Sequence, residues 1–77
     1  MSALRRALER NDIPQALLAY RTGLTTKHVN RVVQGMAPLS VDVAVRIQNA
    51  FPKISAEELL VSQVREQVRE ALEADRG

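Results

Sequence analysis

The sequence predicts an all-α protein of five helices, and two observations support this fold class. Apolar residues recur at spacings of three and four along most of the chain, as they do on the buried stripe of an amphipathic helix. Period-two alternation, which would indicate strands, is scarce outside Val41–Val45. No linker-like tract or internal repeat interrupts the 77 residues, so we expect one domain spanning residues 1–77.

The first two predicted helices are short and end in residues that break helices. Helix one runs from Ser2 to Arg10 and stops at the Asn-Asp pair that follows. Helix two opens at Pro14, whose fixed φ and missing N–H suit a first helical turn. It stops at Gly23, a residue that favours the left-handed C′ position. By helical spacing, the inward residues of these two helices are Leu4, Ala7, Leu8, Leu17 and Leu18.

Helix three combines one apolar stripe with a varied polar side. It begins at Thr25, a good N-cap, and ends at Gly35. A turn at Thr22–Leu24 joins it to helix two, and so short a turn containing Gly predicts a steep crossing with Leu24 in the corner. This geometry lets one helix enter the major groove of DNA. The apolar stripe consists of Val29, Val32 and Val33. The polar side consists of Thr26, Lys27, His28, Asn30, Arg31 and Gln34.

The last two helices are also bounded by recognisable signals. Helix four starts after Ser40, and Pro52 stops it. Helix five starts at the Ser55 and Glu58 pair, which has the spacing of a capping box, and runs to about Ala74. The inward residues of helix four, by spacing, are Val43, Ile47, Ala50 and Phe51.

Helix five carries an apolar stripe that is longer than a body of 54 residues can readily cover. Monomers rarely leave such a patch exposed. We therefore expect a symmetric homodimer with helix five, residues 55–77, at or near the interface. The alternative is that helix five folds back over its own core or frays after Gln63. The predicted dimerisation residues are Leu60, Val64, Val68 and Leu72.

Residues 14–35, "PQALLAYRTGLTTKHVNRVVQG", resemble the helix-turn-helix of the phage-repressor-like (XRE-type) DNA-binding family. The stretch that follows, "GMAPLSVDVAVRIQNAFPKISAEELL", is similar to the HigA-like antitoxin branch of that family. The resemblance as a whole covers residues 4 to about 61, with one apparent extra residue near Lys53. It implies a five-helix bundle of the lambda-repressor type, with residues 1–54 as the DNA-binding body. The positions that carry the resemblance are Gln15, Ala19, Gly23, Leu24, Val29, Val32 and Gly35.

If helix three is the recognition helix, its first two turns would meet base edges. Lys27 and Arg31 can donate to guanine O6 and N7, and the Thr26 methyl can contact thymine. Asn30 can bond adenine at two points. By resemblance, Gln15 would bond a phosphate from the start of helix two. The candidate contacts to the DNA backbone are Gln15, Tyr20, Thr25, His28, Arg5 and Arg6.

Some of these candidate contacts to the DNA backbone have a second interpretation. Arg5 and Arg6 could simply solvate helix one. Tyr20 could be partly buried in packing instead of donating to a phosphate. His28 is interpreted as a surface residue rather than a group that titrates as a switch.

Composition excludes several classes of function. There is no Cys and only one His, so we expect neither a Cys-based nor a multi-histidine metal site. No apolar run approaches the roughly 20 residues of a membrane span, and the first ten residues lack the apolar core of a secretory signal. With no Cys nucleophile, no phosphate-binding glycine loop and no plausible triad, we expect neither an enzyme nor a cofactor. A cytoplasmic, nucleoid-associated protein of bacterial or phage origin is the default.

Charge is divided along the chain in a way that favours a polyanionic partner. Residues 1–54 carry eight Lys and Arg against three Asp and Glu, a net +5, whereas residues 55–77 carry three against six, a net −3. The sequence therefore predicts a regulator, most simply a repressor, that binds double-stranded DNA at a palindromic operator as a homodimer. Two alternatives stay open: an autoregulating antitoxin with a toxin partner, and a protein-interaction module that acts through helix five.

Overall fold

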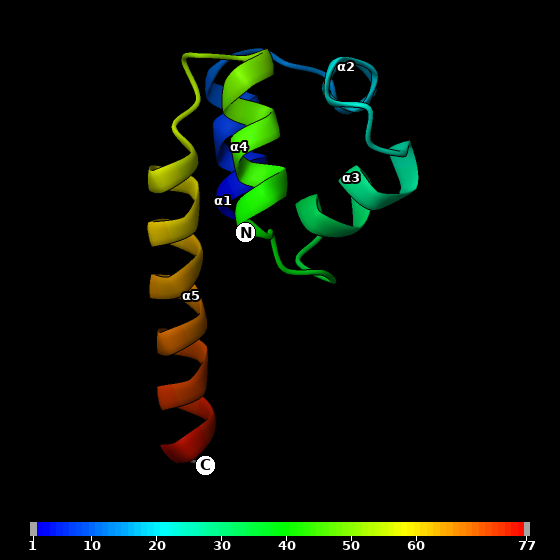
Figure 1. The fold of residues 1–77 in the computed structure, drawn as a ribbon. Helices are drawn as coiled ribbons and strands as arrows, with labels where there is room; N and C mark the ends of the chain where they lie inside the picture. The colour runs from blue at the N-terminus through cyan, green and yellow to red at the C-terminus, as the bar shows by residue number, and fades with distance from the viewer. Residues whose placement is uncertain (1, 77) are drawn as a thin grey trace.

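Within residues 2–76, which the computed structural model describes, the chain forms five α-helices and no strand (Figure 1). The predicted all-α class is therefore confirmed. The helices are α1 (Ala3–Arg10), α2 (Gln15–Thr22), α3 (Thr26–Val33), α4 (Val41–Ala50) and α5 (Ala56–Arg76).

The helices enclose one aliphatic core. Figure 1 shows α4 between α5 on one side and the α2–α3 pair on the other, with α5 returning alongside α4 in the opposite direction. α1 packs against both α3 and α5. Leu18, Val29 and Ile47 are the largest fully buried side chains, and no polar or charged side chain of the described residues is buried. Apolar burial is therefore the main force that holds these helices together.

Serine and threonine side chains cap four of the five helices, as the sequence largely predicts. Thr25 Oγ1 accepts the N–H of His28 at 3.0 Å, and Ser40 Oγ accepts that of Val43 at 3.2 Å. Ser55 Oγ accepts the Glu58 N–H at 3.2 Å, which is one half of the expected capping box. Ser2 is itself an N-cap, so α1 begins one residue later than predicted.

Two further helix boundaries differ from the prediction. α2 begins at Gln15 because Pro14 is extended (φ −66°, ψ 147°) and occupies the N-cap position without a side-chain hydrogen bond. α5 continues past the predicted end near Ala74 to Arg76. Gly23 and Gly35 end α2 and α3 with φ of 75° and 78°, the left-handed conformation expected of them.

The predicted inward face of α2 is wrong at one position. Leu18 is fully buried, but Leu17 is 37% exposed. Ala19 is the second buried residue of α2, so its inward side is centred on Leu18 and Ala19 and leaves Leu17 at the edge. Ala44 of α4 is also fully buried although its small side chain gave little signal in the sequence.

Leu18 and Leu17 provide a matched test of where the core lies. We expect Leu18→Ala to lower the free energy of unfolding by about 2–5 kcal/mol, because it leaves a cavity where three helices meet. Leu17→Ala removes the same atoms from a partly hydrated site and should cost much less. Urea denaturation of both variants measures the difference, and equal losses of stability would contradict a buried Leu18 beside a partly exposed Leu17.

Candidate nucleic-acid interface

α3 is held in the core by one side and exposes a polar side to solvent. Val29, Val32 and Val33 are each at most 4% exposed. The opposite side of the helix carries the four predicted base-contacting residues, all of which are exposed. These residues are Thr26, Lys27, Asn30 and Arg31. The structure therefore brings them together on one accessible helical surface, which we call the α3 polar face.

The α2–α3 turn fixes the direction in which this face points. The Gly23 N–H donates to the Ala19 carbonyl at 3.0 Å, and the Thr22 hydroxyl donates to the Leu18 carbonyl at 2.6 Å. Leu24 is half-buried and packs against the core, as the corner residue was predicted to do. α3 thus packs on α2, which in turn packs on α4.

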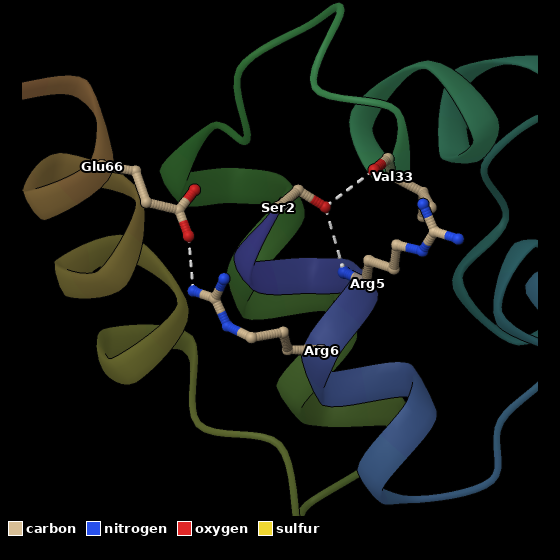
Figure 2. A network of polar contacts seen from close by, with 5 residues as sticks. All are labelled: Ser2, Arg5, Arg6, Val33 and Glu66. Atoms are coloured by element: carbon tan, nitrogen blue, oxygen red, sulfur yellow. Dashed lines mark hydrogen bonds and ion pairs between the residues drawn. The ribbon is translucent and has the colours of Figure 1, made fainter. Parts of the chain in front are cut away.

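The far end of α3 is attached to the start of α1. Ser2 Oγ donates to the Val33 carbonyl at 2.8 Å and accepts the Arg5 N–H at 3.1 Å, so one hydroxyl caps α1 and binds the last turn of α3 (Figure 2). The Met36 N–H donates to the Arg31 carbonyl at 2.9 Å and closes the C-terminus of α3 beyond Gly35. Both ends of the short helix are therefore fixed.

One of the residues predicted to contact the DNA backbone is hydrogen-bonded directly to the α3 polar face. Asn30 Nδ2 donates to Gln15 Oε1 at 3.3 Å. Gln15 is the first residue of α2 and is half-buried, whereas Asn30 is exposed. The sequence placed both residues at the site but did not predict that they touch.

Three other residues predicted to contact the DNA backbone lie on or beside α2 and α3. Tyr20 on α2 is 85% exposed, so the interpretation that it is partly buried in packing is wrong. Thr25 is exposed, and its hydroxyl oxygen is used as the α3 cap. His28 is half-buried in the first turn of α3.

The two arginines of α1 point in different directions. Figure 2 shows the Arg5 side chain extending toward the end of α3, and its Nε lies 3.7 Å from Glu9 Oε2 in an exposed ion pair. Arg6 instead forms an ion pair with Glu66 of α5. The structure does not bring Arg6 together with the α3 residues, because α5 supplies its carboxylate partner.

Gln34 is a neighbour of the site that the sequence analysis did not single out as a contact residue. It is exposed at the C-cap of α3 and lines, with Gln15 and Arg5, a cleft of about 530 Å³ beside the α1–α2 loop. Glu9 and Asp12 line the same cleft. The signals in the sequence were its place on the polar side of helix three and its position directly before the helix-ending Gly35.

A second set of exposed side chains, on α4 and α5, is apolar. Three of the four predicted dimerisation residues are more than half exposed, namely Val64, Val68 and Leu72. Leu60 is the exception, because it is partly buried against its own core. Val61 on α5 and Val41 and Val45 on α4 are exposed as well. We call Val41, Val45, Val61, Val64, Val68 and Leu72 the apolar surface.

Hydrogen bonds show how these two helices adjoin. The Ala56 N–H donates to Gln48 Oε1 at 2.9 Å, which joins the last turn of α4 to the first residue of α5. Gln63 is bonded to both backbone groups of Leu39: Oε1 accepts the N–H at 2.6 Å and Nε2 donates to the carbonyl at 2.9 Å.

α5 leaves the body of the protein after these contacts. Every described residue beyond Glu66 is exposed, and Figure 1 shows this last part of α5 extending past the other helices. The first part of α5 does fold back over its own core, where Ala56 and Leu59 are buried, but the helix does not fray after Gln63, because Ala56–Arg76 is one continuous helix.

Comparisons of the chain with protein-family models, with curated proteins and with solved structures find no match. No helix among the described residues is long and apolar enough to cross a membrane. The same residues contain no cluster of three or more His, Cys, Asp or Glu placed to hold a metal ion.

Thr25 and Thr26 are neighbours with different structural roles, which allows a stability test of the α3 cap. We expect Thr25→Ala to lower the free energy of unfolding by about 1 kcal/mol, because the His28 N–H loses its acceptor. Thr26→Ala should not destabilise the protein, since Thr26 is exposed and Ala has the higher helix propensity. Thermal unfolding compares them; retention of full stability by Thr25→Ala would show that the cap contributes nothing.

Proposed function

We propose that the protein is a transcriptional regulator, a repressor that binds a palindromic operator in double-stranded DNA as a homodimer. The observation that carries the proposal is the α3 polar face. Four exposed side chains with varied hydrogen-bonding groups stand on a helix whose opposite side is anchored by three buried valines. The resemblance of residues 14–35 to XRE-type helix-turn-helix domains supports the same function.

In this proposal α3 lies in the major groove and its first two turns contact base edges. Lys27 and Arg31 donate to guanine O6 and N7, Asn30 bonds adenine, and the Thr26 methyl contacts thymine. Gln15, Tyr20 and Arg5 lie toward the flanking phosphates, together with Gln34 at the far end of α3. The net charge of +5 on residues 1–54 favours approach to DNA regardless of sequence. The protein acts in the cytoplasm of a bacterium, on the chromosome or on phage DNA.

The homodimer forms through the apolar surface. Two copies related by a two-fold axis would present two recognition helices to a site with matching symmetry. The exposed part of α5 also favours a second candidate function. In an antitoxin, or in a module that only binds proteins, the same valines and Leu72 would contact a different protein partner.

The first experiment measures binding to DNA from just upstream of the protein's own gene, and to a scrambled duplex, across a salt series. We expect a preference of about 10³-fold or more for the upstream DNA. Asn30→Ala/Arg31→Ala should abolish most of it, because each good base contact contributes about 1–3 kcal/mol of discrimination.

Gln67→Ala/Arg69→Ala is the matched control for this experiment. It removes one amide and one guanidinium from exposed positions of α5 and should leave the preference intact. Equal and steeply salt-dependent binding to both duplexes would show that the protein is attracted only to the DNA phosphates, without recognising the base sequence. Absence of binding at low salt would exclude the regulator and favour the interaction module.

The apolar surface gives a separate prediction about assembly. Val64→Asp/Val68→Asp should convert a dimer into a folded monomer, because each copy would bring two carboxylates into the interface and bury four like charges there. Sedimentation equilibrium measures the mass, and circular dichroism checks that helix content is retained. Tyr20→Asp, which changes an exposed side chain of α2, should stay dimeric. A wild-type protein that is monomeric at all concentrations would refute the dimer.

A further inference from the structure

The Arg6–Glu66 ion pair lies where α5 leaves the body of the protein. Glu66 is half-buried, and every described residue after it is exposed. Figure 2 shows the Arg6 side chain reaching from α1 to the Glu66 carboxylate. The pair therefore holds α5 at the last position that packs against the body, before the rest of the helix extends into solvent.

Two polar attachments, one turn apart, restrain the angle of α5. Apolar contacts hold the first turn of the helix, where Ala56 and Leu59 are buried, but apolar attraction has no preferred direction. Gln63 is hydrogen-bonded to both backbone groups of Leu39, just before α4. Glu66 is bound from α1. Because charge-assisted hydrogen bonds are directional, these attachments from two separate elements fix the tilt of α5 against the body.

The ion pair lies far enough along α5 to control its free end. Glu66 is near the middle of a helix of 21 residues that runs from Ala56 to Arg76. With a rise of about 1.5 Å per residue, Glu66 is about 15 Å from each end. If α5 turned about its first residue, a displacement of about 2 Å at Glu66 would become about 4 Å at Arg76.

We propose that the Arg6–Glu66 pair sets the distance between the two α3 helices of the homodimer, and with it the half-site spacing that the dimer reads. The inference rests on the proposed function, in which two copies pair through the exposed residues of α5. Each body is then attached to the paired helices at the angle that the ion pair fixes. α3 belongs to the body, so a change of that angle moves both recognition helices.

Charge reversal breaks the pair from either side and then restores it. Arg6→Glu opposes two carboxylates, and Glu66→Arg opposes two guanidiniums. Arg6→Glu/Glu66→Arg pairs the charges again with their places exchanged. Arg10→Glu is the matched control, because Arg10 is exposed on the same helix and has no ion pair among the described residues. It changes the net charge by the same amount as Arg6→Glu.

The first measurement is made on the dimer without DNA. The chain has no Cys, so Ala16→Cys at an exposed position of α2 takes one spin label in each copy. Double electron–electron resonance measures the distance between the two labels. We expect a narrow distribution for the labelled parent, the Arg10→Glu control and the double reversal. Each single reversal should shift or broaden it by about 4 Å or more, the displacement expected at the end of α5.

The second measurement concerns recognition. Duplexes carry the half-site selected by the wild type as an inverted repeat, with spacers that differ by one base pair. We expect each single reversal to lower the preference for the best spacer over its neighbour about fivefold or more, because one base-pair step is only about 3.4 Å. The double reversal should restore it. The preference is a ratio within one variant, so a general change of affinity cancels.

The outcomes separate this inference from the proposed function. Single reversals with unchanged label distances and spacer preference would overturn the inference and leave the DNA-binding dimer standing. Single reversals that are monomeric by sedimentation would also overturn it, because the pair would then serve assembly and not spacing. If the wild type dimerises but selects no duplex, the proposed function fails, while the label distances still decide what the ion pair does. A wild type that is always monomeric would refute both.

Discussion

The packing of α2 against α3 and α4, with Leu18 fully buried, is the interaction on which the rest of the structure depends. α2 packs against both of these helices, and Leu18 is its one fully buried side chain. Helices of eight residues, such as α2 and α3, are too short to be stable alone in water. They exist because their apolar sides are buried together. The polar side of α3 is therefore held in place by packing on the opposite side of the same helix.

A small aliphatic core leaves the helix ends to be fixed by local hydrogen bonds, and these bonds also connect distant elements. Ser2 caps α1 and binds the last carbonyl of α3, so the two helices share one hydroxyl. One turn later in α1, Arg6 pairs with Glu66 of α5. α1 is thus bonded both to the end of α3 and to α5.

The sequence predicted where the helices lie along the chain better than it predicted which residues contact one another between helices. Glycine, serine and threonine mark helix ends through local chemistry, which is why the ends at Gly23 and Gly35 and the caps were predictable. Leu17 and Leu18 are equally apolar, and only the packing of α2 against two other helices decides between them. The Arg6–Glu66 and Gln15–Asn30 pairs depend on how the helices pack, so the spacing of residues along the sequence does not reveal them. The contribution of Val41 and Val45 to the apolar surface could not be predicted from the sequence for the same reason.

The change of net charge along the chain matches the separation of the α3 polar face from α5 in space. The net charge is +5 on residues 1–54 and −3 on residues 55–77, and α5 lies on the side of α4 away from α3 (Figure 1). Near a polyanion such as DNA, this arrangement favours an orientation with α3 toward the phosphates and α5 away from them. Arg6 is consistent with it, because its charge is neutralised locally by Glu66. Protein contacts through α5 and DNA contacts through α3 would then use opposite sides of the molecule, so neither would block the other.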